Sequence, residues 1–213
     1  MTTLILNCSP RREGVTTTIL RTIADSIAST QVKWVNVNDL AIRPCTGCLE
    51  CRPDKKCTLP YDDAHRVGEL IEKSDLLIVG TPTYWGNITG PLKLLFDRNV
   101  STFQYVGTGL PKPRQKGKKA MLVVASSAPF PANLLPCWSG GTLRALRTVL
   151  RAGGYRIVKT INVPNASHFD QVRATVLRKA GRIGREILIY PHGPFSRSID
   201  KPLPPAIPPQ FGA

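Results

Sequence analysis

Residues 3–18, TLILNCSPRREGVTTT, decide the fold. The stretch begins with a short apolar run, Thr3–Asn7, which breaks at Ser9 and Pro10 before a polar loop. Three threonines at 16–18 then open a segment with an apolar face at helical spacing, formed by Ile19, Leu20, Ile23 and Ile27. The stretch therefore predicts a buried strand, a loop and an amphipathic helix.

The same alternation of strand and helix continues along the chain. Four further runs predict strands: Val32–Val37, Leu76–Val79, Ala120–Ala125 and Ile157–Val163. Helical spacing predicts helices over Ala64–Glu72, from Leu92, over Leu143–Leu150 and from about Asp170 to Ile189. This order predicts an α/β fold, a doubly wound five-stranded parallel sheet with helices on both faces. We expect one domain over residues 1–190, a cysteine-rich insertion loop at 43–60 and a proline-rich extended tail at 191–213.

Composition and charge narrow the class of protein. The 213 residues are 42% hydrophobic, enough for the core of one large domain. No apolar run approaches the roughly 20 residues of a membrane span, and Met1 leads straight into a strand without a basic leader, so we expect a cytoplasmic protein. Residues 107–213 carry 17 Lys and Arg against 3 Asp and Glu, which accounts for most of the net charge of +15. We expect this basic half to attract anions, such as phosphorylated cofactors or acidic redox partners.

The loop after the first strand has the chemistry of a phosphate site. It leads into a helix N-terminus, whose free N–H groups and dipole favour an anion. Gly14 permits a close turn, Arg11 adds a charged donor, and hydroxyl donors come from Ser9, Thr16, Thr17 and Thr18. The loop has neither the G-x-G-x-x-G pattern of a dinucleotide site nor the lysine of a nucleotide-binding P-loop, so those two classes are disfavoured.

Two further loops are expected at the same sheet edge. The loop after the third strand carries Pro82, Thr83, Tyr84, Trp85, Gly86 and Asn87. Its aromatic pair can pack on a flat ring, and the N–H groups near Gly86 and Asn87 can bond the polar edge of that ring. Ser126 and Ser127 follow the fourth strand and reach the same edge in a parallel sheet. Together the three loops predict a flavin site.

Four cysteines, Cys45, Cys48, Cys51 and Cys57, lie within 13 residues. Soft ligands at this density suit an iron-sulfur cluster of the [4Fe-4S] type, and a cluster close to the flavin edge would pass on single electrons. Two alternatives stay open at this point: free or redox-active thiols, and a structural Zn(II) site.

Three segments resemble the NADPH-dependent FMN reductases of flavodoxin-like fold, and within them the iron-sulfur flavoproteins. They are SPRREGVTT at 9–17, DLAIRPCTGCLEC at 39–51 with Cys57 six residues on, and GTPTYWGNITGPLKLLFDR at 80–98. The resemblance implies that Ser9, Arg11, Thr16 and Thr17 hold the phosphate of FMN, and that residues 82–87, with Ser126 and Ser127, border the flavin ring. It also implies a homodimer or homotetramer. Val15 departs from the pattern, because the family usually has a small polar residue there.

These observations predict an NAD(P)H-dependent FMN oxidoreductase, in which hydride passes from the nicotinamide to FMN and electrons go on to a small molecule or an acidic protein. We expect the 2′-phosphate of NADPH to meet a basic residue such as Lys112, Arg114 or Arg144. One alternative is an FMN and iron-sulfur electron carrier without reductase activity. Another is a zinc protein that binds nucleic acid through Arg144, Arg147 and Arg151, which we disfavour because basic residues at helical spacing usually form a solvated face.

Overall fold

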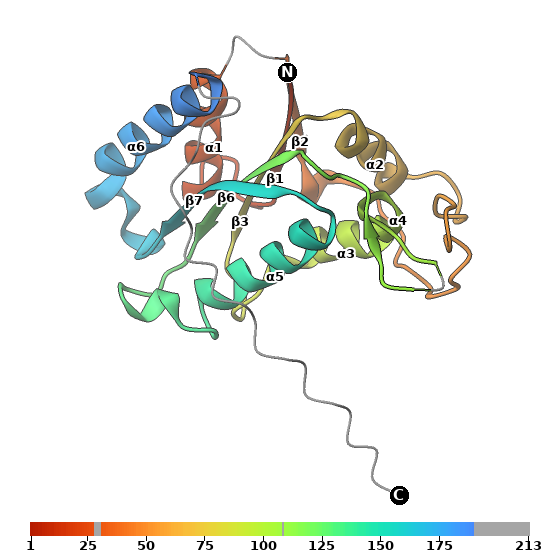
Figure 1. Ribbon diagram of the computed structural model, residues 1–213. Coiled ribbons are helices and arrows are strands. Elements are labelled where there is room, and N and C mark those ends of the chain that lie inside the picture. Colours follow the sequence, from red (N-terminus) through yellow and green to blue (C-terminus); the bar gives the residue numbers. More distant parts are fainter. Residues whose placement is uncertain (28–30, 108, 190–213) are drawn as a thin grey trace, which may run out of the picture.

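A computed structural model describes residues 1–27, 31–107 and 109–189 of the chain. Its centre is a five-stranded parallel sheet in the order β2-β1-β3-β6-β7 (Figure 1). The strands are β1 (Thr2–Asn7), β2 (Gln31–Asn36), β3 (Leu76–Pro82), β6 (Lys119–Ala125) and β7 (Arg156–Val163). All five were predicted from the sequence, and each boundary lies within a few residues of its prediction. The fold class is therefore confirmed.

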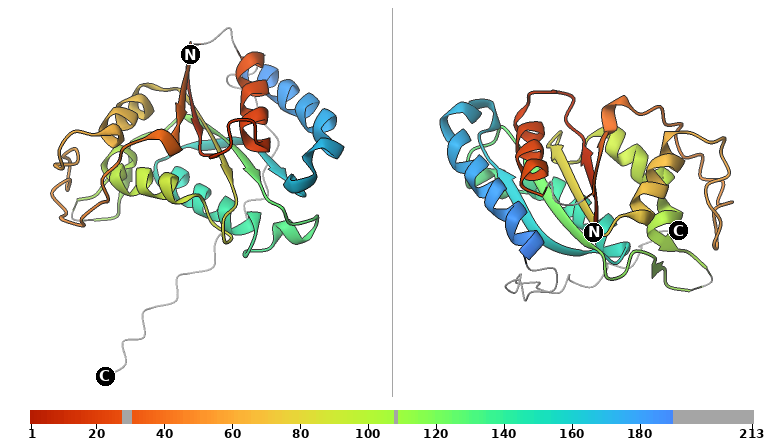
Figure 2. Two further views of the ribbon diagram at one scale, coloured as in Figure 1. Left: turned by 180° about the vertical axis from the view of Figure 1, so that it is seen from behind. Right: turned by 90° about the horizontal axis from the view of Figure 1, so that it is seen from above.

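Helices cover both faces of the sheet (Figure 2). One face packs against α1 (Val15–Ser26) and α6 (Phe169–Ile189), through a core that includes Ile23 and Ile183. The opposite face packs against α2 (Asp63–Lys73), α3 (Gly90–Arg98), α4 (Val100–Phe103) and α5 (Ser139–Ala152). The central strands β1, β3 and β6 are almost wholly buried because both of their faces are covered, which explains their continuous apolar sequences.

Sheet topology positions the site. From β1 the chain moves outward to β2, and then crosses back to place β3 on the other side of β1. The loops after β1 and β3 therefore leave neighbouring strands in opposite directions, and a crevice opens between them at the carboxyl edge of the sheet. Because β6 is parallel to β3, its following loop reaches the same edge.

Three segments differ from the predicted elements or lie beyond them. Residues 107–119, for which the sequence predicted no strand or helix, contain strand β5 (Lys112–Pro113), which pairs antiparallel with β4 (Gln104–Tyr105). The short helix α4 was not predicted either. The tail predicted at 191–213 lies outside the described residues. No helix in the described ranges combines the length and apolar character that crossing a membrane requires.

Candidate functional site

A pocket of about 300 Å³ lies at the carboxyl edge of the sheet. It is lined by residues from the loops after β1, β3 and β6, as the sequence predicted. The predicted residues that line it are Ser9, Arg11, Thr16, Pro82, Thr83, Tyr84, Ser126 and Ser127. Ala166 and Ser167, which follow β7, line it as well. Those two residues were not predicted, although a fifth parallel strand must end at the same edge.

The loop after β1 is closed by its own hydrogen bonds. Ser9 Oγ accepts from the Arg11 N–H at 3.2 Å, and Thr17 Oγ1 donates to the Arg11 carbonyl at 2.8 Å. Thr18 Oγ1 donates to the Gly14 carbonyl at 3.1 Å. Thr17 and Thr18 were predicted to contact the ligand, but they do not line the pocket and their hydroxyls bond to the loop backbone. They shape the loop, whereas Ser9, Arg11 and Thr16 face the pocket.

The N-terminus of α1 opens into this pocket. Its N-cap residue is Gly14, no side chain caps the helix, and its first turn holds no acidic residue. A Cβ at Gly14 would stand 2.9 Å from the Arg11 Cβ, so the close turn needs a glycine. Uncapped N–H groups, the positive end of the helix dipole and the exposed Arg11 thus converge on one point. This arrangement suits a dianionic phosphate.

The loop after β3 forms a tight turn. The Tyr84 N–H donates to the Asn87 carbonyl at 3.0 Å, and the Asn87 N–H donates back at 2.9 Å. Trp85 and Gly86 both have positive φ, at 53° and 68°, which is the signature of a type I′ turn. The predicted aromatic pair is divided: Tyr84 lines the pocket, while Trp85 is 102% exposed and does not. Of this pair, Tyr84 is therefore the residue that faces the pocket.

Hydrogen bonds from α5 hold the remaining wall of the pocket in place. Ser139 Oγ donates to Ser126 Oγ at 2.9 Å, which holds a buried serine at the end of β6. Thr142 Oγ1 bonds to both Thr83 Oγ1 and the Asn87 carbonyl, each at 3.0 Å. The start of α5 therefore fixes both the β3 loop and the β6 loop.

The cysteine segment, residues 43–60, is largely exposed and contains no helix or strand. Burial raises the pKa of Cys51, and the charges of Cys57, Cys45 and Cys48 raise it further, so the four thiols are near enough to interact. Within the described residues, no three His, Cys, Asp or Glu side chains gather closely enough for a metal ion. Thiolates around one Zn(II) lie only about 2.3 Å from it, whereas a four-iron cluster holds its ligands farther apart. In the part of the chain that the structure describes, the four thiols are therefore not gathered into a site of either kind.

A buried ion pair holds the base of this segment. Asp62 follows the segment, and its carboxylate accepts from Arg98 Nη1 at 2.7 Å and from the Arg43 N–H at 3.1 Å. Burial alone would raise the pKa of Asp62, but the hydrogen bonds from Arg98 and Arg43 hold it at about 2. Arg98 Nη1 also donates to the Arg43 carbonyl at 2.6 Å. The two ends of the segment are thus joined through Arg98, a residue without a predicted role.

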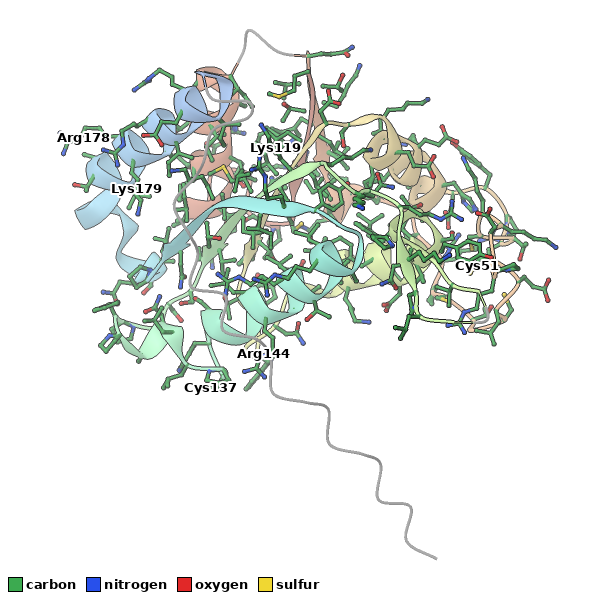
Figure 3. All side chains as sticks on the ribbon, in the orientation of Figure 1. Cys51, Lys119, Cys137, Arg144, Arg178 and Lys179 are labelled. Atoms are coloured by element: carbon green, nitrogen blue, oxygen red, sulfur yellow. The ribbon has the colours of Figure 1, made fainter. Side chains whose placement is uncertain are left out.

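The cysteine segment does not line the pocket. Figure 3 shows Cys51 and Cys137 on opposite sides of the molecule, and Cys137 adjoins the β3 turn, since a Cβ at Gly86 would stand 2.8 Å from the Cys137 carbonyl. The expectation that the cysteines stand close to the flavin edge is therefore not met within one chain. The reason is geometric: residues 43–60 lie over α4 and the β4-β5 pair, where the Val106 N–H donates to the Pro53 carbonyl.

Known proteins resemble this chain in both sequence and fold. An iron-sulfur flavoprotein of Methanocaldococcus jannaschii is 33% identical over 93 residues, which are 43% of this chain and 48% of that protein. One of Archaeoglobus fulgidus is 34% identical over 101 residues, which are 46% and 49% of the two chains. The matched segments thus span about half the length of these relatives.

Solved structures share the fold at low identity. An FMN-dependent NADH-azoreductase from Bacillus anthracis in complex with FMN has a TM-score of 0.69 at 13% identity, over 90% of this chain and 99% of that one. An NAD(P)H:quinone oxidoreductase from Methanothermobacter marburgensis has a TM-score of 0.66 at 18% identity, over 88% and 97%. The fold is therefore flavodoxin-like. The model of one family, NADPH-dependent FMN reductase, matches residues 1–133, which is more than half of the sequence. With the strand order and the pocket, this match shows that the chain belongs to the NADPH-dependent FMN reductase family.

Proposed function

We propose that the chain binds FMN in the pocket at the carboxyl edge of the sheet and oxidises NAD(P)H there. The observation that carries the proposal is the uncapped N-terminus of α1, which faces the pocket beside Arg11 at the crevice between β1 and β3. When bound, FMN supplies an acceptor for hydride and can release the electrons one at a time.

The chain's own groups position and shield such a cofactor. Ser9, Arg11, Thr16 and the first N–H groups of α1 hold the phosphate. Pro82, Thr83 and Tyr84 border one side of the ring, and Ser126 and Ser127 border the other. The N–H groups of Tyr84 and Asn87 bond across the turn, so those of Trp85 and Gly86 at its tip are the ones left for the polar edge of the ring. The double hydrogen bond across this turn keeps them in place without reorganisation.

Of the three basic residues considered for NADPH, we assign the role to Arg144. Lys112 lies in β5, and Arg114, which directly follows that strand, pairs with Asp54 in the cysteine segment. Arg144 is exposed on α5, on the same side of the molecule as Cys137 (Figure 3). Arg144→Ala should therefore reduce the preference for NADPH over NADH, as measured by kcat/KM. The exposed Arg151→Ala, two turns along the same helix, is the matched control. An unchanged preference in Arg144→Ala would remove this assignment.

We propose that Cys45, Cys48, Cys51 and Cys57 hold a [4Fe-4S] cluster that takes electrons from FMN. The four cysteines within 13 residues and the names of the curated relatives support it. Because the segment and the pocket of one chain lie apart, the electrons would cross between two copies of the chain in a homodimer or homotetramer. Exposed apolar side chains around the pocket support such an assembly: Tyr84, Trp85, Phe130, Leu134, Leu135 and Trp138.

Electrons leave to a small molecule or an acidic protein. The second choice is supported by exposed cations along α6, namely Arg178, Lys179, Arg182 and Arg185. Arg178 and Lys179 stand out from the helix in Figure 3. The nucleic-acid alternative loses support, because Arg147 and Arg151 already interact within the chain.

One anaerobic experiment separates an enzyme from a carrier. Full-length protein is loaded with FMN and mixed with NADPH or NADH, and flavin absorbance is followed in time. We expect the flavin to be bleached by a stoichiometric amount of reduced nicotinamide. Tight FMN binding without bleaching would favour the electron carrier, and no FMN binding would end both proposals.

A further inference from the structure

A buried arginine beside the cysteine segment has an unused hydrogen-bond donor. The Arg98 side chain is 0% exposed, and its two terminal nitrogens bond to Asp62 and to the Arg43 carbonyl. Its Nε lies fully buried and has no hydrogen-bond partner among the residues that the structure describes. A buried donor without a partner destabilises the folded protein, so a group that accepts from Nε would stabilise it.

Cys57 is the cysteine that shares a small cavity with Arg98. Arg98 and Cys57 line the same cavity of about 20 Å³, which has room for little more than one water molecule. Burial alone would lower the pKa of Arg98, but Asp62 and the Cys57 side chain raise it above its ordinary value. Cys57 is also fixed from the other side, because His65 Nε2 donates to its carbonyl at 3.0 Å.

The other cysteines lack this support. Cys45 and Cys48 are exposed and Cys51 is half-buried, as Cys57 is, but none of the three lines the cavity. The carboxylate of Asp62 links the two supports of Cys57, since it pairs with Arg98 and also lies 3.1 Å from His65 Nδ1. Cys57 is therefore held in place before any ligand binds, while the loop at 45–51 can adjust around it.

We propose that Arg98 is a positioning residue for the proposed cluster, and that its Nε–H donates a hydrogen bond to the Cys57 sulfur. This inference rests on the proposed function of the four cysteines. One-electron reduction adds negative charge that the cysteine sulfurs share, and a hydrogen bond to a sulfur stabilises that charge. Arg98 would thereby raise the reduction potential of the cluster, so that it accepts an electron from reduced FMN more readily.

Wild-type protein provides the first test, without any substitution. The full chain is produced with ¹⁵N-labelled arginine, reconstituted with iron and sulfide without oxygen, reduced with dithionite and studied by electron-nuclear double resonance. We expect ¹⁵N coupling from an arginine to the cluster spin, and its absence would overturn the proposal. Iron analysis of the same sample keeps the two proposals apart: a chain that takes up no iron loses the cluster and Arg98's role together, whereas iron without coupling removes only the role of Arg98.

Two substitutions separate the hydrogen bond from the charge. Arg98→Lys keeps a cation for Asp62 but has a methylene where Nε stood, whereas Arg98→Gln keeps an N–H at that position and loses the cation. We expect Arg98→Lys to lower the equilibrium constant for cluster reduction about tenfold, which is about 59 mV for one electron. Arg98→Gln should stay closer to wild type. A potential unchanged in Arg98→Lys, or lower in Arg98→Gln than in Arg98→Lys, would overturn the proposal. If the Lys variant does not fold, the labelled wild type and Arg98→Gln decide.

Discussion

The pocket at the sheet edge and the cysteine segment are built in opposite ways. The pocket is formed by loops that leave buried parallel strands, and each loop is fixed by short hydrogen bonds to its own backbone or to α5. The cysteine segment has no strand or helix of its own, and its ends are joined by one ion pair between Asp62 and Arg98.

Because of this difference, the two regions suit different kinds of ligand. A preformed cradle binds its ligand without losing conformational entropy, which suits a resident cofactor. An open loop anchored at one cysteine can close around a larger inorganic group as that group is inserted. If this comparison is right, damage to one region should leave the other intact.

The largest effect is expected at Gly141, where the backbone of α5 packs directly against neighbouring backbone beside the pocket. A Cβ at Gly141 would stand 2.1 Å from the Gly86 carbonyl oxygen and 2.2 Å from that of Pro136. Gly141→Ala should therefore destabilise the protein by about 3 kcal/mol and displace the turn at 84–87, with loss of FMN affinity. Thermal unfolding and FMN titration measure both effects. Gly90→Ala is the control, because nothing lies within 4 Å of its Cβ. Equal stability of the two variants would show that α5 does not fix this turn.

The next effect belongs to the cysteine segment and depends on pH. The folded pKa of Asp62, about 2, lies below its ordinary value of 3.8, so its ionised form stabilises the fold above pH 4. That stability, about 2 kcal/mol, is lost as the pH falls from 4 towards 2. Asp62→Asn should lack it at pH 7 and show a shallower loss between pH 4 and 2 in urea unfolding.

Two comparisons make the Asp62 result decisive. Asp97→Asn removes an exposed carboxylate that pairs with Lys93, and it should change stability very little. FMN affinity should be the same in Asp62→Asn as in wild type. A large fall in that affinity would mean that the two regions are not independent.

A smaller effect is expected inside the phosphate loop. Thr17 is buried, and its hydroxyl bonds to the Arg11 carbonyl and, at 3.3 Å, to Asn7 Oδ1. Thr17→Val should cost about 1 kcal/mol and reduce FMN affinity about fivefold, because the loop loses its brace. Thr22→Val removes a hydroxyl that bonds to the Thr18 carbonyl within α1, and should leave FMN affinity unchanged. Isothermal titration compares the two variants, and equal affinities would rule out the brace.

The smallest effect concerns the tip of the β3 turn. Trp85 is fully exposed and does not line the pocket, so Trp85→Ser should leave FMN affinity of the isolated chain within about twofold of wild type. The same variant should weaken self-association, measured by sedimentation. A large loss of FMN affinity at a concentration where the chain is monomeric would place Trp85 on the ring instead.

The pocket could be predicted from the sequence because its strands and loops follow local sequence patterns. Apolar runs at 3–7, 76–79 and 120–125 predicted the buried strands, and parallel strands bring their following loops to one edge. Which side chains face the pocket was less predictable. Trp85 and Thr17 have the right chemistry, but a positive φ turns one outward and an internal hydrogen bond occupies the other.

The support of the cysteine segment could not be predicted. Arg98 lies 41 residues beyond Cys57 in sequence and meets it only because α3 packs beside the segment. No spacing rule links such residues. The sequence places Asp62 before a helix, where a cap is expected, but nothing in it indicates that the same carboxylate pairs with a buried arginine.

The proposed FMN binding and NAD(P)H oxidation both depend on the phosphate site. Comparing the affinities for FMN and riboflavin tests that site most directly. The two ligands share the ring and differ only in the phosphate that α1 and Arg11 are proposed to hold. Calorimetric titration of the full-length chain should show FMN binding roughly a hundredfold more tightly than riboflavin, as expected for charge-assisted hydrogen bonds at a helix N-terminus. Equal affinities, or no binding of FMN at micromolar concentration, would contradict the account.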